Sequence, residues 1–306
     1  MSFDDAPVIA VGPKPDPEFD AAITAGGGKP GPLSRASGLV WTDSRAALPD
    51  LPPTVRWVQL PFAGVEGFID SGVLARNPKV VFTSAAGAYS GTVAEQAIAL
   101  LLAGVRGLWH RESEWDAAGA AARTGRLGGT TVAIIGAGGI GRDLIPALRG
   151  LGVKVVAVNR SGTDVSDAVV VTADHLDEVW PAVDHVILAA PSTAETRALV
   201  NAKVLAQLKP HSWVVNVARG SLIDTDALVE ALRKGTIGGA ALDVTDPEPL
   251  PAEHPLWSIP NAIITPHVAN PPQHLRPALL ARVEVNVRRF ANGMEPLAVI
   301  DADRGY

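Results

Sequence analysis

Three segments of the 306-residue sequence carry side chains that could share one chemical task. Arg219 is a permanent cation whose planar fork binds a carboxylate bidentately. His267 carries an imidazole, the side-chain type that can give a proton in reduction and take one in oxidation. Glu248, hydrogen-bonded to that imidazole, would orient the ring and favour its protonated form. Arg219, Glu248 and His267 stand 29 and 19 positions apart in that order, and together they predict reduction of a small 2-oxo acid.

These segments follow short runs of apolar, β-branched residues that are typical of buried strands. Seven such runs alternate with helix-compatible stretches and predict one doubly wound parallel sheet of the Rossmann type. The runs are residues 131–135, 154–158, 168–171, 185–189, 213–217, 239–243 and 262–265. Because ligands gather outside the carboxyl ends of the strands in such sheets, the three segments can converge there.

The first third of the chain predicts a second, smaller α/β unit. Its candidate strands are residues 8–11, 38–41, 55–60 and 80–83, and residues 26–32 are expected to form a loop. Long helices are predicted over 92–106 and 275–292, with a polar connection from the first helix to about Gly129. An apolar tail, residues 297–300, could return to either unit.

A glycine loop follows the first of the seven runs. Gly136, Gly138 and Gly141 have the spacing of a dinucleotide-binding turn, and the loop with Gly139 and Ile140 is expected to hold the pyrophosphate at a helix N-terminus. Pro146 lies inside the predicted helix, 142–149. A proline removes a helical hydrogen bond, but we expect a smaller loss of helix stability here because Pro146 falls in the first turns.

The end of the second run predicts which cofactor is preferred. Enzymes that use NAD usually carry an acidic residue there, but this sequence has Asn159, Arg160 and Ser161. Arg160 can pair with a 2′-phosphate, and its two neighbours can add hydrogen bonds. NADP(H) is therefore the preferred cofactor and NAD(H) a possible one. The alternative is that Arg160 is a solvated surface residue or stacks on adenine.

Composition excludes several other classes of function. Hydrophobic residues make up 47% of the chain and charged residues 19%, as in a packed globular protein, and the net charge of −6 gives no general attraction to nucleic acid or anionic lipid. No apolar run reaches the roughly 20 residues needed to cross a bilayer. The absence of cysteine and of a secretory signal predicts a cytoplasmic protein without disulfides. No metal-ligand motif or serine-hydrolase motif is present, so no metal is expected.

Two motifs resemble the D-isomer-specific 2-hydroxyacid dehydrogenase family. The stretch NVARGSLIDTDALVEALRKGTIGGAALDVTDPEPLP is similar to that family's segment from its catalytic arginine to its catalytic glutamate. The stretch PLWSIPNAIITPHVA is similar to the segment that bears its catalytic histidine. The resemblance covers most of the chain from about Arg56 onward. It implies a glyoxylate- or hydroxypyruvate-reductase-like enzyme with Arg219, Glu248 and His267 as catalytic residues.

The resemblance also implies the roles of other segments. It divides the chain into a flavodoxin-like substrate domain, residues 1–91 and 276–306, and a dinucleotide-binding domain, residues 92–275, and implies a homodimer. The substrate would contact Ala63, Gly64 and Val65 besides Arg219 and His267. Further cofactor contacts are expected at Pro191, Thr193, Val217, Ala218 and Asp243. Thr245, Asp246 and the sequence Asn270-Pro-Pro depart from the family pattern, which leaves the choice of substrate open.

Two other functions remain open on the sequence alone. One is a non-catalytic nucleotide sensor or corepressor on the same fold, and the other is a formate- or phosphite-type dehydrogenase. The remaining histidines are expected to be surface or satisfied polar residues: His110, His175, His185, His211, His254 and His274.

Overall fold

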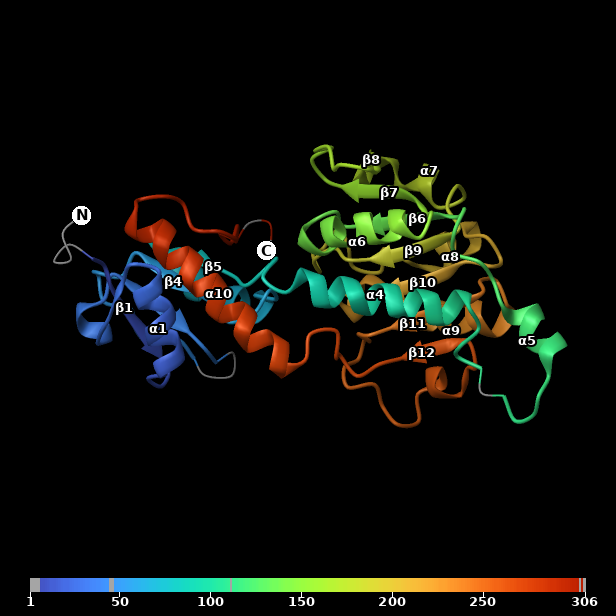
Figure 1. Ribbon diagram of the computed structural model, residues 1–306, viewed down its shortest axis with the longest axis horizontal. Coiled ribbons are helices and arrows are strands. Elements are labelled where there is room, and N and C mark those ends of the chain that lie inside the picture. Colours follow the sequence, from blue (N-terminus) through green and yellow to red (C-terminus); the bar gives the residue numbers. More distant parts are fainter. Residues whose placement is uncertain (1–5, 44–46, 111, 303, 305–306) are drawn as a thin grey trace. The chain divides into compact units, whose positions relative to one another are not determined.

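The chain folds into two compact α/β units (Figure 1). A computed structural model describes residues 6–43, 47–110, 112–302 and 304. The chain before Ser90 and after Asn270 forms the smaller unit, and Ser90–Asn270 forms the larger one. Each unit contains one sheet whose ladders are all parallel.

The smaller unit has a five-stranded sheet in the order β2-β1-β3-β4-β5, the strand order of flavodoxin-like folds. Its strands are β1 (Val8–Gly12), β2 (Lys29–Pro30), β3 (Gly38–Trp41), β4 (Trp57–Gln59) and β5 (Val81–Thr83). Its helices are α1 (Pro17–Ala25), α2 (Glu66–Asp70), α3 (Val73–Arg76) and α10 (Pro272–Ala291). Leu279, Val283 and Val287 of α10 are buried against Ile9 and Trp57, which explains why the last helix belongs to this unit.

The larger unit has a seven-stranded sheet in the order β12-β11-β10-β9-β6-β7-β8. Its strands are β6 (Thr131–Ile135), β7 (Lys154–Asn159), β8 (Val169–Thr172), β9 (His185–Leu188), β10 (Trp213–Asn216), β11 (Gly239–Leu242) and β12 (Ala262–Ile264). Its helices are α4 (Ser90–Val105), α5 (Ala117–Arg123), α6 (Gly139–Gly150), α7 (Leu176–Val179), α8 (Ala202–Gln207) and α9 (Thr225–Lys234). The strand order reverses between β6 and β9, which is the switch point at which Rossmann-type sheets bind dinucleotides. The predicted fold class and all seven strands are confirmed.

Three local expectations were wrong or incomplete. Residues 26–32 contain the strand β2, which is only two residues long and exists through its pairing with β1 rather than through its own pattern. The polar connection before Gly129 contains helix α5, which Asp116 caps through the Gly119 amide. Helix α6 begins at Gly139, so Pro146 lies in its interior and not in its first turns.

The apolar tail returns to the smaller unit. The Ile300 amide donates to the carbonyl of Phe82 at 2.9 Å, and the Ser84 amide donates to the carbonyl of Ala298 at 2.9 Å. Among the described residues, no helix is long and apolar enough to cross a membrane.

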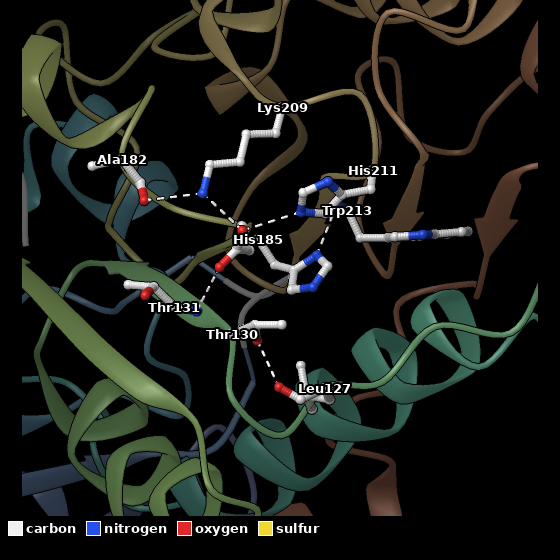
Figure 2. Close-up of polar contacts among 9 residues, drawn as sticks. Leu127, Thr130, Thr131, Ala182, His185, Lys209, His211 and Trp213 are labelled. Carbon is white, nitrogen blue, oxygen red and sulfur yellow. Dashed lines mark hydrogen bonds and ion pairs between the residues drawn. The ribbon is translucent and has the colours of Figure 1, made fainter.

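A closed polar network occupies the amino-terminal edge of the larger sheet (Figure 2). One carboxylate oxygen of Asp184 lies 2.8 Å from the Lys209 ammonium and 3.1 Å from Nε2 of His211, and the other accepts the Thr131 amide at 2.8 Å. Burial opposes the charge of Asp184, but these hydrogen bonds outweigh it and lower its pKa from 3.8 to about 2.

Next to this network, Nδ1 of the buried His185 accepts the Trp213 amide at 3.2 Å. Burial, with a smaller contribution from the charge of His211, lowers the pKa of His185 from 6.5 to about 4. The imidazole is therefore a neutral acceptor that ties β9 to β10.

Candidate functional site

Three neighbouring strands of the larger sheet end in register at its carboxyl edge. Asn216 at the end of β10 pairs with Leu242 of β11, and Leu242 pairs with Ile264 of β12. The segments that contain Arg219, Glu248 and His267 begin at these strand ends. The sheet register therefore brings the three segments to one edge.

A side-chain turn shapes the segment that carries Arg219. Asn216 is fully buried, its Oδ1 accepts the Ala218 amide at 3.0 Å, and its Nδ2 donates to the carbonyl of Arg219 at 2.8 Å. Arg219 is half-buried, and its guanidinium donates to the carbonyl of Ala218 at 2.8 Å. Val217 and Ala218 are both buried beside it. Asn216 thus stops the strand and fixes where the arginine leaves the sheet.

The loops that carry Arg219 and Glu248 lie directly against each other. A Cβ added at Gly220 would meet the backbone carbonyl of Thr245 at 2.0 Å, so only glycine fits there. Since Gly220 adjoins Arg219 and Thr245 lies three residues before Glu248, this close approach fixes the two loops relative to each other.

His267 and Glu248 form a direct hydrogen-bonded pair. Nδ1 of His267 lies 2.6 Å from Oε1 of Glu248, and the two side chains are 52% and 43% exposed. Oε2 of Glu248 accepts the Thr245 amide in a long contact of 3.4 Å. The carboxylate holds one ring nitrogen, which leaves Nε2 to face solvent or a substrate.

Asp243 holds the backbone on which His267 sits. It is 2% exposed, its carbonyl accepts the His267 amide at 2.8 Å, and its carboxylate accepts the amides of Val268 and Ala269 at 3.0 Å each. The Thr265 hydroxyl also donates to Oδ1, at 2.5 Å. Of about four acceptor positions on a carboxylate, three are used by described residues, which leaves one on Oδ2.

The glycine loop fits a dinucleotide at each of its three positions. Gly136 has φ +103°, and a Cβ there would meet the Ala190 backbone at 2.5 Å; a Cβ on Gly141 would meet the Gly136 carbonyl at 2.8 Å. Gly138 caps the N-terminus of α6, and no described atom lies within 4 Å of the Cβ it lacks. Open space beside the unpaired amides of a 12-residue helix suits a pyrophosphate. Gly139 and Ile140 form the first turn of that helix.

The end of β7 offers an unsatisfied polar atom. Nδ2 of Asn159 donates to the carbonyl of Thr163 at 2.8 Å, while its Oδ1 is buried without a partner among the described residues. An acceptor of this kind suits a ribose hydroxyl. The exposed residues Arg160 and Ser161 follow it, and the Ser161 hydroxyl lies 2.6 Å from that of Thr163.

The loop after β9 contains the other expected cofactor residues. The carbonyl of Pro191 accepts the Thr196 hydroxyl at 2.7 Å, and the Thr193 hydroxyl donates to Glu195 at 2.7 Å. That hydrogen bond lowers the pKa of Glu195, and the charge of Arg160 adds to the effect. The loop is therefore held by its own side chains next to the charge of Arg160.

The predicted substrate loop belongs to the smaller unit. Ala63 is exposed and its amide donates to the Tyr89 hydroxyl at 2.7 Å, whereas Val65 is buried at the start of α2. Gly64 lies half-buried between them.

The sequence analysis assigned no role to three residues that hold the site: Asn216, Thr265 and Gln96, whose side-chain amide donates to the Thr265 hydroxyl. The only available signal for Asn216 was an asparagine directly after a hydrophobic strand, which is typical of a turn that its side chain closes.

Comparison with known proteins identifies the family. The model of the D-isomer specific 2-hydroxyacid dehydrogenase NAD-binding domain matches residues 98–269. A glyoxylate reductase from Pyrococcus furiosus is 32% identical over 251 residues, which are 78% of this chain and 72% of that protein.

Two solved structures share the whole architecture. A D-isomer specific 2-hydroxyacid dehydrogenase from Xanthobacter autotrophicus Py2, in complex with NADPH and MES, has a TM-score of 0.81 at 25% identity and covers 98% of this chain and 100% of that one. An NADPH-dependent glyoxylate/hydroxypyruvate reductase from Sinorhizobium meliloti, in complex with NADP and sulfate, has a TM-score of 0.75 at 26% identity and covers 98% and 100%. The chain therefore belongs to the D-isomer-specific 2-hydroxyacid dehydrogenase family and is an NAD(P)-dependent oxidoreductase that acts on the CH–OH group of its donors.

Proposed function

We propose that this enzyme interconverts a short 2-oxo acid of the glyoxylate or hydroxypyruvate class and its 2-hydroxy acid. The observation that carries the proposal is the His267–Glu248 pair, which shares one sheet edge with the Arg219 turn. The names of the Pyrococcus and Sinorhizobium relatives support the substrate class.

Arg219 is proposed to bind the substrate carboxylate. Its guanidinium offers several donors in a plane, of which one is directed to the Ala218 carbonyl, so the fork is oriented by its own loop. We also propose that the backbone of Ala63, Gly64 and Val65 contacts the same carboxylate, on the family resemblance of that loop.

His267 is proposed to protonate the carbonyl oxygen. When bound, a dihydronicotinamide would supply the hydride for the carbonyl carbon. Nε2 of the imidazolium gives its proton to the oxygen as negative charge develops there, and the ring regains a proton from solvent. Glu248 holds Nδ1, so the ring keeps its orientation toward the substrate. In the direction of oxidation the same ring takes the proton.

The larger unit is proposed to bind NADP(H) in preference to NAD(H). The glycine loop would hold the pyrophosphate, Asn159 a ribose hydroxyl, and Arg160 and Ser161 the 2′-phosphate. Asp243 has one acceptor position left for the nicotinamide amide, and Pro191, Thr193, Val217 and Ala218 would line the same site. The Xanthobacter structure contains NADPH, which supports this preference.

The cofactor proposal is tested by kcat/KM for NADPH and NADH with wild type and Arg160→Ala. The variant should lose about tenfold or more with NADPH and little with NADH, because only NADPH carries the 2′-phosphate. Arg149→Ala, another arginine of the same unit, is the control. A wild-type preference for NADH would contradict the proposal.

The substrate proposal is tested by a panel of glyoxylate, hydroxypyruvate, larger 2-oxo acids, formate and phosphite, each with both cofactors. Turnover should be highest with the short 2-oxo acids. Turnover confined to formate or phosphite would overturn the proposal in favour of that type of dehydrogenase.

We further propose a cytoplasmic homodimer with a substrate domain formed by residues 1–91 and 276–306 and a cofactor domain formed by 92–275. The absence of cysteine fits a reducing compartment. Between α4 and α5, Trp115 is 98% exposed and Leu108 is 73% exposed, and a second copy of the chain could cover such large apolar side chains. The mass in solution, measured by light scattering, should be that of a dimer for wild type and lower for Trp115→Glu; a wild-type monomer would contradict the dimer.

A further inference from the structure

His267 sits in a backbone conformation that few residues other than glycine adopt. Its φ is +52°, in the left-handed region that residues with a Cβ rarely adopt. Such a conformation persists only where neighbouring contacts hold it. Asp243 supplies these contacts on both sides of the turn, through Thr265 before His267 and the amides of Val268 and Ala269 after it.

The Thr265 hydroxyl has a defined direction of donation. It has one proton, which it donates to the carboxylate of Asp243, so toward any other partner it can only accept. Nε2 of Gln96 donates to this oxygen at 3.2 Å. The amide of Gln96 must present its NH₂ group, because a carbonyl at that place would face the lone pairs of Thr265. The chain of donation therefore runs from Gln96 through Thr265 to Asp243.

Helix α4, which carries Gln96, also contacts the far end of the turn. One helical turn before Gln96, the Thr92 hydroxyl donates to Oδ1 of Asn270 at 3.1 Å. The helix packs on α6, β10 and β11 (Figure 1), so it is fixed to the sheet and to the helix that begins at the glycine loop. Two side chains of one rigid helix thus hold the segment from Thr265 to Asn270, in which His267 lies.

We infer that Gln96 is a positioning residue for the proton donor, acting on His267 through the Thr265 hydroxyl and the Asp243 carboxylate. The inference rests on the proposed role of His267. Gln96 fixes the direction of the Thr265 hydroxyl, the hydroxyl and the turn amides fix Asp243, and Asp243 fixes the backbone from which the imidazole reaches Glu248.

Gln96→Met and Gln96→Glu test the donation. Methionine keeps the length of the side chain but cannot donate, so kcat should fall about tenfold to a hundredfold, with a small change in KM. Glutamate has the shape of glutamine but donates only when protonated, so its kcat relative to wild type should recover as the pH is lowered from about 8 to about 5, while the methionine ratio stays flat. NADPH affinity without substrate and the thermal unfolding midpoint should remain those of wild type.

The matched control is Gln207→Met, the same change at a half-buried glutamine of α8, which should leave kcat unchanged. A wild-type kcat in Gln96→Met would overturn the inference. Equal losses in the methionine and glutamate variants at every pH would overturn it as well, because they would show that packing and not donation matters.

Thr265 tests the same hydrogen bond from its other end without changing the helix. Thr265→Ser keeps the hydroxyl, so its kcat should stay near that of wild type. Thr265→Val lacks the hydroxyl, so its kcat should fall. The double variant Gln96→Met with Thr265→Val should be no slower than Thr265→Val alone, since one chain of donation is broken once. Additive losses would contradict a shared chain.

The failure of this inference differs from the failure of the proposed function. If wild type reduces no 2-oxo acid, the proposed function fails. If wild type reduces one and the Gln96 and Thr265 variants do so equally well, only the positioning role fails.

Discussion

The amino and carboxyl edges of the seven-stranded sheet each contain a histidine–carboxylate pair. The two pairs differ in the number of hydrogen-bond partners of the carboxylate and in the exposure of the side chains. At the amino edge, His211 and Lys209 share one oxygen of Asp184, and the Thr131 amide takes the other, with the carboxylate side chain only 19% exposed. At the carboxyl edge, His267 and Glu248 bind each other through one atom each, and both side chains are about half exposed.

The difference separates a structural network from a reactive one. The carboxylate of Asp184 accepts three hydrogen bonds and its pKa is lowered to about 2, so it stays ionised near neutrality. The side chains of Glu248 and His267 are about half exposed, so their pair can respond to a substrate. Residue types alone therefore do not identify a site; the hydrogen-bond partners and the exposure of each group distinguish the two pairs.

The largest difference in kcat/KM is expected between substitutions of Arg219, at the carboxyl edge, and Lys209, at the amino edge. Arg219→Ala should lower kcat/KM for a 2-oxo acid by about 100-fold or more, because the substrate carboxylate loses a bidentate partner. Arg219→Lys keeps the charge without the fork and should fall between the alanine variant and wild type. Lys209→Met should leave kcat/KM unchanged, measured in the same steady-state assay. An equal effect of Arg219→Ala and Lys209→Met would remove the distinction.

His185 should dominate the pH dependence of stability in weak acid. Its pKa is about 4 in the folded chain against an ordinary 6.5, so between these values the unfolded chain binds a proton that the folded chain does not. The contribution of His185 to the free energy of unfolding is fully present above pH 6.5. It is lost as the pH drops toward 4 and amounts to about 3 kcal/mol.

Urea unfolding of His185→Gln at a series of pH values measures this contribution. The variant should lack that part of the slope between pH 6.5 and 4, while His274→Gln, at an exposed histidine, should keep it. Identical slopes in wild type and His185→Gln would show that the imidazole is not held neutral.

A smaller effect in a lower pH window is expected from Asp184. Its pKa is lowered from 3.8 to about 2, so its stabilisation is present above pH 3.8 and is lost as the pH falls toward 2. The shift corresponds to about 2 kcal/mol. Asp184→Asn should remove this contribution, which acid-induced unfolding followed by circular dichroism would measure, and should not change kcat. An unaltered acid transition would show that the network contributes little.

The sequence predicted the parts of the fold that depend on local pattern. β-branched runs such as 131–135 are buried on the sheet whatever their neighbours, so their strands were found. β2 was missed because a strand of two residues has no hydrophobic periodicity. It is defined only by its pairing with β1. The early position expected for Pro146 was wrong because the glycines at the start of α6 are helical in spite of their low propensity.

For the site, the motifs predicted which segments matter but not how they are held. Arg219, Glu248 and His267 follow strand ends whose carboxyl edge is predictable from the topology. The Gln96–Thr265 contact joins residues 169 positions apart and depends on how α4 packs on the sheet, which no local pattern encodes. The burial of His185 and the exposure of His267 likewise follow from packing.

The most direct test of the account compares His267→Asn with His211→Asn in single-turnover reduction of glyoxylate by saturating NADPH. The account predicts a loss of about 100-fold or more in the rate of the first variant, with NADPH still bound, and the wild-type rate in the second. Reduction by His267→Asn at the wild-type rate would contradict the assignment of the proton donor.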